Sequence, residues 1–501
     1  MLSSKMIPKK NDGESLEEEQ LLNQHTIASY DSIRDDYSQE DLHENQQYVQ
    51  ETTYAEELSY IARNSIPNCA GFLLQYCINA FPVFFVSHLG KEELAANALA
   101  MTTYYITGPS IFMGMATAID TICSQSYGAK QYHLVGLYFQ KNVVLSMILF
   151  VPLSILWINM DKVLRLFVHN NRIIELATIY FHIMFLEAPA FIFYENGKRF
   201  IQAQGIFNAV IYILSIVVPI NLCLNYALIL SDTFGIGYIG SPIASVISYW
   251  LMAILLGLYI RFVNGSKCWV KINRSDIFHD LGGLIRLNIY GAIMTLSETF
   301  AFQIITVMVA QFDVFQLAAQ SVTATYSNYF FTIPFAVGVV GSMRIGNYIG
   351  SGNKRSAIMA TRCLYSIAIC LGFSNFSIIF FTRNYIARYF ADGDLELGQI
   401  ISNCLIIVAI FQMLDCGFNI CSAAVLRAQG RQRIGGILSF VSYYVVGLIL
   451  ELYFGFYLKY KLFGFWCGLS LGLAFLSITQ TFCIIKSDWD EIISGARLHH
   501  H

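Results

Sequence analysis

Twelve apolar stretches of membrane-spanning length take up most of this 501-residue chain. A helix needs about 20 mostly apolar residues to cross a bilayer. Only 13% of the residues are charged, whereas soluble proteins carry about 25%. The pattern therefore predicts an all-α polytopic membrane protein with twelve transmembrane helices. The stretches lie at 65–88, 96–118, 140–160, 176–197, 206–230, 238–262, 286–311, 317–340, 361–382, 399–426, 434–457 and 462–485.

Similar short segments recur in the two halves of the chain at a nearly constant spacing. Leu94-Ala95-Ala96-Asn97 recurs as Leu317-Ala318-Ala319-Gln320, 223 residues later (317 − 94). Gln202-Ala203-Gln204-Gly205 recurs as Arg427-Ala428-Gln429-Gly430, 225 residues later (428 − 203). The repeated order predicts two six-helix repeats. Because six is an even number, both repeats enter the membrane from the same side. We therefore expect two parallel bundles related by a pseudo-two-fold axis along the membrane normal.

The regions outside the apolar stretches suggest the domain organisation. Residues 1–60 are rich in Asp and Glu and lack apolar periodicity, so we expect a disordered acidic tail there. This tail has no apolar core of the kind that signal peptides carry. We then expect a first lobe over 61–262, a cytoplasmic linker over 263–285, a second lobe over 286–486 and a C-terminal tail over 487–501.

The basic residues of the loops predict the orientation in the membrane. The loops on the N-terminal side carry twelve Lys and Arg residues, and the loops on the opposite side carry eight. Because cytoplasmic loops carry the excess of basic residues, we expect both termini in the cytoplasm. The tail segment Glu17-Glu18-Glu19-Gln20-Leu21-Leu22 resembles an acidic dileucine sorting signal. Such a signal would direct the protein to a vacuolar membrane, with the plasma membrane as the alternative.

The cysteines and histidines predict neither a disulfide framework nor a zinc site. Most of the twelve cysteines lie inside apolar stretches, and no Cys-x-x-Cys pair occurs. The terminal residues His499, His500 and His501 are too few to predict a metal site. No phosphate-binding P-loop motif is present, which argues against direct use of ATP. We expect no metal, no cofactor and no nucleic-acid partner.

An acidic residue, Glu298, lies near the middle of the apolar segment from Leu287 to Gln311. An ionised Asp at a helix centre costs at least about 2.5–3.5 kcal/mol on insertion scales. An acid at this depth therefore usually faces a wet cavity, carries a proton or binds a cation. Because burial favours the neutral form of a carboxyl group, we predict that Glu298 exchanges a proton for a cationic substrate. The alternative is a neutral side chain hydrogen-bonded to a neighbouring helix.

Several motifs resemble those of the multidrug and toxic compound extrusion (MATE) family, of the fungal or eukaryotic type. The segment AIDTICSQSYGA at 118–129 is similar to the pattern that closes the second helix. FPVFFVSHLG at 81–90, KRFIQAQG at 198–205, RIGNYIGSGN at 344–353 and LRAQGRQ at 426–432 fit further family motifs in the right order. The resemblance covers nearly everything but the N-terminal tail. It implies two six-helix bundles around a central cleft, and export of organic cations or other amphiphiles in exchange for protons or sodium.

The resemblance also implies which acids couple transport to the ion. An acid of the seventh helix is central in eukaryotic members, and Glu298 matches its position. The acid of the tenth helix usually lies eleven residues before an Arg, but Asp415 lies twelve residues before Arg427. Either a local bulge restores Asp415 to the cleft, or Asp415 points elsewhere. Gln303 stands where the family often has a second acid, and the first helix has no acid, which argues against ion coupling through the first half.

Other polar and aromatic residues inside the stretches are candidate substrate contacts. Gln75 and Asn79 are four residues apart and share one helix face, from which they would line the first-half side of the cleft. Gln303 offers an uncharged hydrogen bond. Asn225 either bonds a neighbouring helix or faces the cavity. Two tyrosines, Tyr326 and Tyr329, either hold flat cations by cation–π attraction or pack toward lipid.

Three charged residues, Glu195, Lys198 and Arg199, have the three- and four-residue spacing of ion pairs within one helix. We expect them to form structural ion pairs that fix a helix end.

These features predict a secondary active antiporter rather than an enzyme. It would export organic cations, xenobiotics or toxic metabolites in exchange for protons by alternating access. Its expected partners are a small organic cation or amphiphile, protons (with sodium as the alternative) and the lipid bilayer, and we expect a monomer. A flippase for lipids or lipid-linked precursors and a non-transporting receptor or sensor stay open as alternatives. A membrane-embedded acyltransferase would use a buried His, and only His182 lies well inside an apolar stretch.

Overall fold

The computed structural model describes residues 52–168, 170–271, 274–391 and 393–498. The predicted disorder of residues 1–51, the predicted sorting signal at 17–22 and the terminal histidines 499–501 lie outside these residues. Among the described residues, eleven helices are long and apolar enough to cross a membrane, and there are twelve if a bent pair is counted as one span. The structure thus confirms the predicted fold class.

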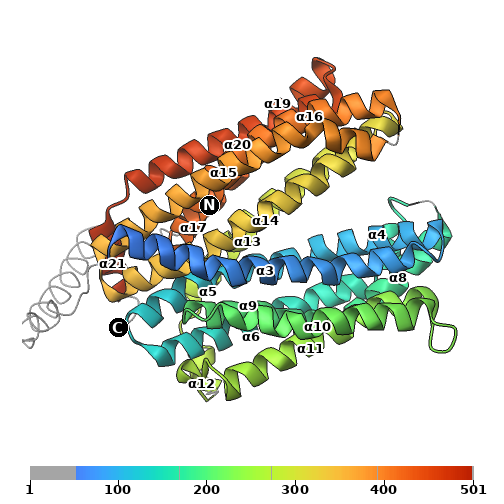
Figure 1. Ribbon diagram of the computed structural model, residues 1–501. Helices are drawn as coiled ribbons and strands as arrows, with labels where there is room; N and C mark the ends of the chain where they lie inside the picture. The colour runs from blue at the N-terminus through green and yellow to red at the C-terminus, as the bar shows by residue number, and fades with distance from the viewer. Residues whose placement is uncertain (1–51, 169, 272–273, 392, 499–501) are drawn as a thin grey trace, which may run out of the picture. The chain divides into compact units, whose positions relative to one another are not determined.

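The first half of the chain contains six spans, two of which are interrupted (Figure 1). Gly108 separates α4 from α5, and the axes of α8 and α9 are bent by 54°. The spans are α3 (Tyr54–Val86), α4 (Lys91–Thr107) with α5 (Pro109–Gly128), α6 (Tyr132–Ile158), α8 (Asn171–Met184) with α9 (Ala188–Ala203), α10 (Asn208–Asn225) with the π-helix η1 (Tyr226–Leu230), and α11 (Gly240–Phe262).

The second half has six spans as well, and π-helical turns interrupt two of them. They are α13 (Gly282–Val309), α14 (Val314–Ser351), α15 (Lys354–Ala391), α16 (Leu395–Leu414) with η4 (Asp415–Asn419) and α17 (Ile420–Ala428), α18 (Gln432–Phe440) with η5 (Val441–Gly447), α19 (Leu448–Leu452) and η6 (Tyr453–Tyr457), and α20 (Lys461–Ile485). Shorter helices are α7 (Met160–Leu164), η2 (Gly237–Ile239), η3 (Ser266–Cys268), α12 (Arg274–Ile277) and α21 (Trp489–Leu498).

Helix α3 begins at Tyr54, whereas the sequence had suggested a tail through residue 60. A capping box starts the helix: Thr53 Oγ1 accepts a hydrogen bond from Glu56 N, and Glu56 accepts one from Thr53 N. The next residue, Glu57, is buried, and Arg344 of α14 donates to it from Nη2 at 2.7 Å and from Nε at 3.1 Å. The acidic start of the helix is therefore paired with the second half, which a charge count along the sequence does not reveal.

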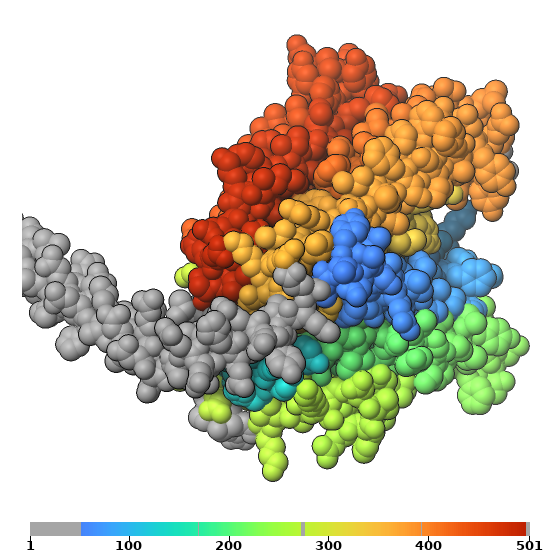
Figure 2. All heavy atoms as spheres, turned by 60° about the vertical axis from the view of Figure 1, so that its left-hand side comes forward, coloured from blue at the N-terminus to red at the C-terminus, as the bar shows by residue number. Residues whose placement is uncertain are grey.

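Most of the hydrogen bonds that join the two halves lie, among the described residues, toward the end where α3 begins and α5 and α14 finish. Asn68 Nδ2 donates to Ala336 O at 2.8 Å, and Gln125 Nε2 donates to Ala428 O at 2.8 Å. Figure 2 shows the start of α3, in blue, against the orange residues of the second half. Toward the other end, the ribbons of α13 and α14 diverge from α3 and α4 (Figure 1). The halves are closed against each other at one end only.

Glycines allow the backbones of the two halves to touch at this closed end. A Cβ on Gly114 of α5 would lie 2.6 Å from Ala292 Cα of α13. A Cβ on Gly350 of α14 would lie well inside contact distance of the Gln125 carbonyl oxygen, and Gly128 faces Asn347 in the same way. Any side chain at these positions would separate the helices, so the closed end depends on their absence.

Gly350→Ala should therefore shift the protein away from the form that is closed at this end. Overpacking costs about 1–3 kcal/mol, and about 1.4 kcal/mol is tenfold in an equilibrium constant. The measurement is the distance distribution between spin labels placed at Lys130 and Lys354 in a background without other reactive cysteines. Gly495→Ala in α21 is the matched control, because a Cβ there meets nothing within 4 Å. Unchanged distances in Gly350→Ala would contradict the prediction.

The connection between the halves is attached to α6 of the first half. Gln140 Nε2 donates to Val270 O at 2.7 Å, and Lys141 Nζ donates to His279 O at 2.8 Å. The attachment ends at Gly282 and Gly283, which open α13 and have free space around them. The linker thus belongs physically to the first half up to the start of α13.

Candidate functional site

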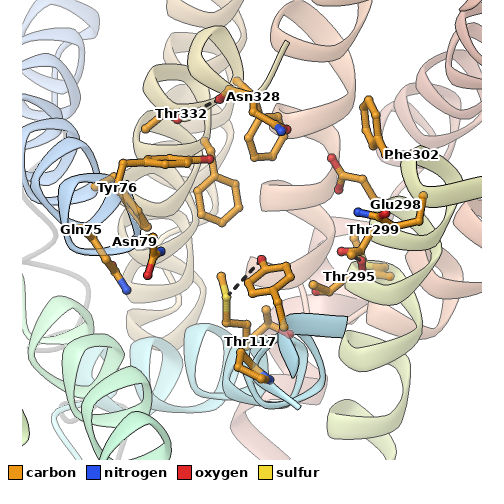
Figure 3. A pocket seen from close by; sticks show the side chains of 18 of the residues that line it. Gln75, Tyr76, Asn79, Thr117, Thr295, Glu298, Thr299, Phe302, Asn328 and Thr332 are labelled. Carbon is orange, nitrogen blue, oxygen red and sulfur yellow. Dashed lines mark hydrogen bonds between the residues drawn. The ribbon is translucent and has the colours of Figure 1, made fainter. Parts of the chain in front are cut away.

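A cavity of about 540 Å³ lies between the two halves. Its wall comes from α3, α4, α5, α8, α9 and α11 of the first half and from α13, α14, η4, α17, α18, η5 and α20 of the second. Figure 3 shows Gln75, Tyr76 and Asn79 of α3 facing Glu298 and Thr299 of α13 across this space. Polar side chains form the largest group among the residues that line the cavity, followed by aromatic and then aliphatic ones. Apolar walls with polar groups among them suit small organic molecules.

Glu298 lies in the middle of α13 and its carboxyl group points into the cavity (Figure 3). Thr295, Thr299 and Phe302 occupy the same face of the helix and line the cavity with it. These spacings of three and four residues are those of a single helix face. Glu298 therefore has the hollow beside it that a proton- or cation-carrying role requires.

Asp415 reaches the same cavity through a π-helical turn. It opens η4, is 1% exposed and accepts a hydrogen bond from Asn419 Nδ2 at 2.8 Å. A π-helical turn takes one residue more than the α-helix it interrupts. That extra residue accounts for the spacing of twelve rather than eleven between Asp415 and Arg427, and both residues line the cavity.

Three of the predicted substrate contacts line the cavity. They are Gln75, Asn79 and Gln303. Gln75 also donates from Nε2 to Glu195 Oε1 at 3.4 Å, so the α3 face is tied to α9. The other three predicted contacts lie elsewhere.

The prediction of a cavity position was wrong for Asn225, Tyr326 and Tyr329, none of which belongs to the cavity lining. Asn225 is fully buried and donates to Asn221 O at 2.9 Å, a hydrogen bond within α10 rather than one to a neighbouring helix. Tyr326 packs on Phe330 at a ring distance of 6.3 Å. Tyr329 is 53% exposed and lies 6.0 Å from the Tyr76 ring. Neighbouring positions of α14, including Asn328 and Thr332, face the cavity instead.

The predicted ion pairs are rearranged. Lys198 Nζ lies 2.7 Å from Glu195 Oε1, as the spacing suggested. Arg199 instead contacts Asp120 of α5, with 2.5 Å between Nη1 and Oδ2, because Asp120 is fully buried on the helix that packs against α9. Arg427 of the second half approaches the same carboxylate, with 3.7 Å between Nε and Oδ2. Asp120 thereby joins arginines from both halves.

A further acid of the cavity wall, Glu187, was not among the predicted site residues. Glu187 is 2% exposed, lies between α8 and α9, and lines the cavity. The sequence signal was an acid beside Pro189 inside an apolar stretch. Among the described residues there is no group of three or more His, Cys, Asp or Glu that would hold a metal ion.

Comparisons with known proteins match this architecture. The MatE family model matches the chain twice, at 67–227 and 292–452, with starts 225 residues apart (292 − 67). The chain is 35% identical to the uncharacterized transporter YDR338C of Saccharomyces cerevisiae, over 89% of this chain and 64% of that protein. It therefore spans slightly less than two thirds of that relative's length.

Two further proteins cover nearly the same region. Multidrug and toxin extrusion protein 1 of Xenopus tropicalis is 30% identical over 85% of this chain and 73% of its own length. A crystal structure of the eukaryotic MATE transporter AtDTX14 superimposes with a TM-score of 0.82 at 25% identity, covering 89% of this chain and 98% of that one. With two family matches, twelve apolar spans and a cavity between twin halves, this chain belongs to the MatE family of membrane transporters.

Proposed function

We propose that the protein is a secondary active antiporter, rather than an enzyme, which exports organic cations, xenobiotics or toxic metabolites in exchange for protons. The observation that best supports this proposal is the pair Glu298 and Asp415. The two carboxyl groups come from different helices, line one cavity, and form no ion pair with any described residue. The extrusion named for the Xenopus relative agrees with this activity.

The exchange follows from competition for the same two carboxyl groups. Glu298 and Asp415 line one cavity, and two carboxylates that share a site repel each other when both are ionised. In an empty cavity at least one of them is therefore best protonated. A bound organic cation favours the ionised form, so the cation and the proton exclude each other. The aromatic side chains of Tyr76, Tyr105 and Phe331 line the cavity and offer faces for flat cations.

Directional transport requires that the cavity open to one side at a time. In this structure the halves meet at the end where α3 begins, which is the cytoplasmic end if both termini are cytoplasmic. Protons from the opposite side then displace the cation outward. After the halves rock to the other state, a cation from the cytoplasm displaces the proton. We propose this cycle for a monomer in the vacuolar or plasma membrane.

The flippase alternative needs a basic cleft for an anionic headgroup. The two arginines of the cavity wall, Arg199 and Arg427, both face the buried Asp120. Both arginines thus have a carboxylate within 4 Å, at 2.5 Å for Arg199 and 3.7 Å for Arg427, which favours a cationic substrate over an anionic lipid headgroup. A non-transporting receptor would be favoured if the shifted spacing had moved Asp415 away from the cavity. The π-helical turn accounts for that spacing, so Asp415 does not favour a receptor.

The test is uptake of radiolabelled tetraethylammonium into proteoliposomes that contain the full-length chain. Uptake is measured with an imposed pH gradient, with an imposed sodium gradient and with neither. The proposal expects uptake that is driven by the pH gradient and collapses when a protonophore dissipates it. Uptake driven by the sodium gradient alone would show that sodium, not the proton, is the coupling ion. Uptake that is independent of both gradients would overturn the antiport mechanism.

A further inference from the structure

A third acid of the cavity wall, Glu187, comes from the first half of the chain. It lies between α8 and α9, whose axes are bent by 54° relative to each other. Its side chain is almost fully buried, and its Oε2 has no hydrogen-bond partner among the described residues. Neighbouring Glu195 differs, because it has both Lys198 and Gln75 as partners. Glu187 is thus a buried carboxyl group whose remaining surroundings are the cavity itself.

The bend that carries Glu187 is held by side chains from two other helices. Tyr104 of α4 donates its hydroxyl to Met184 O at 3.2 Å, and Trp250 of α11 donates Nε1 to Leu186 O at 3.0 Å. Phe191 N donates to Glu187 O at 2.9 Å, which starts α9. The carboxyl group therefore lies at the N-terminus of a 16-residue helix, whose dipole favours negative charge.

The charges of the cavity wall leave Glu187 without compensation. The charged side chains that line it are Glu187, Glu298, Asp415, Arg199 and Arg427. Both arginines are directed to Asp120, which stands behind the wall. An ionised group buried without a partner is costly, and a cation in the cavity removes that cost. Acids on both halves thus face the same space, and the two arginines of the wall have Asp120 as their ion-pair partner.

The surroundings of Glu187 are also suited to an organic cation. Tyr104, Tyr180 and Tyr249 line the cavity together with Glu187. Phe191, one helical turn along α9, lines the cavity as well. Aromatic rings around an acid form the kind of environment that holds ammonium groups.

We propose that Glu187 forms a second anionic subsite, which binds one end of a substrate that carries two positive charges. Glu298 and Asp415 bind the other end. This inference rests on the antiport proposed above and deepens it, because it names a dication with an apolar spacer as the preferred substrate class. A cavity of about 540 Å³ is within the range that takes one small organic molecule.

The experiment compares two probes in the proteoliposome assay with an imposed pH gradient. Tetraethylammonium carries one charge, and hexamethonium carries two quaternary ammonium groups joined by six methylenes. The measured quantity is the ratio of their half-saturating concentrations. In Glu187→Gln we expect this ratio, hexamethonium over tetraethylammonium, to rise at least about tenfold over the parent, because a buried ion pair is lost at one end. Glu187→Asp keeps the charge and should restore most of the selectivity.

A matched control variant and a binding measurement distinguish the loss of a subsite from misfolding of the variant. Glu175→Gln removes an exposed acid of α8, whose partner Arg172 is also exposed, and should leave the ratio as in the parent. In detergent, hexamethonium should raise the unfolding temperature of the parent more than tetraethylammonium does, and Glu187→Gln should lose that difference.

The outcomes separate this inference from the function on which it rests. Parent protein that exchanges tetraethylammonium but not hexamethonium would overturn the second subsite and leave the antiport intact. An unchanged ratio in Glu187→Gln would overturn the subsite too. A parent that moves neither probe against a pH gradient would overturn the antiport itself, and the subsite with it.

Discussion

Glu298→Gln is expected to abolish pH-driven uptake of tetraethylammonium. Glutamine keeps the size and the hydrogen-bonding capacity of the side chain, but it neither carries a proton in exchange nor pairs with a cation. Loss of one partner of a buried charge pair costs about 2–5 kcal/mol, which corresponds to more than about tenfold in affinity. Initial uptake rates at several external pH values measure both effects, and the pH dependence should flatten.

Glu396→Gln serves as the control for this variant. Glu396 lies in the exposed first turn of α16, far from the cavity lining, so its replacement should leave uptake at the parent's level. Glu298→Gln protein must also elute as a single species of the parent's size, so that a loss of uptake is not a loss of folding. Retention of pH-driven uptake by Glu298→Gln would remove the central residue from the mechanism.

Asp120→Ala is expected to destabilise the protein by about 3–5 kcal/mol, the usual cost of leaving one partner of a buried ion pair alone. Asp120 is fully buried, and Arg199 and Arg427 approach it from both halves. Its removal leaves two largely buried guanidinium groups with no carboxylate between them. The measurement is thermal unfolding of the detergent-solubilised protein, with a large decrease in unfolding temperature as the expected result.

Asp313→Ala provides a matched comparison at the other end of the molecule. Asp313 pairs with Lys461 at 2.9 Å, but both side chains are more than 40% exposed. Asp313 also caps α14 by accepting a hydrogen bond from Gln316 N at 2.9 Å. Its replacement should therefore cost about 0–1 kcal/mol for the exposed pair and about 1 kcal/mol for the cap, less than the loss of Asp120. Similar effects of Asp120→Ala and Asp313→Ala would show that the buried cluster is not a structural junction.

The fold was predictable because spanning length and internal repetition are properties of the sequence alone. The twelve apolar stretches correspond to helices of the structure, and the two family matches repeat the offset seen in the short motifs. Asp415 shows how far spacing can lead: one surplus residue before Arg427 indicated a bulge, and η4 is a π-helical turn. The lobe boundaries stay predictions. Helix α3 begins at Tyr54, seven residues before the expected start of the first lobe at residue 61 (61 − 54).

The cavity wall was less predictable because it depends on how each helix is rotated about its axis. Tyr326 and Tyr329 were chosen for their chemistry, but Asn328 and Thr332 occupy the face of α14 that meets the cavity. Glu187 was difficult to assign for a different reason. Its position follows from a bend between two helices, and nothing in the local pattern of apolar residues shows whether a buried acid has a partner.

The attachment of the linker to α6 restricts how the two halves can rotate against each other. Gln140 and Lys141 bind the backbone of the connecting segment, so that segment travels with the first half as one body. The covalent joint between the moving parts is then reduced to the Gly282-Gly283 step, which has free space on every side. In the rocking motion proposed above, a pivot this short would place the axis at the N-terminal end of the helix that carries Glu298.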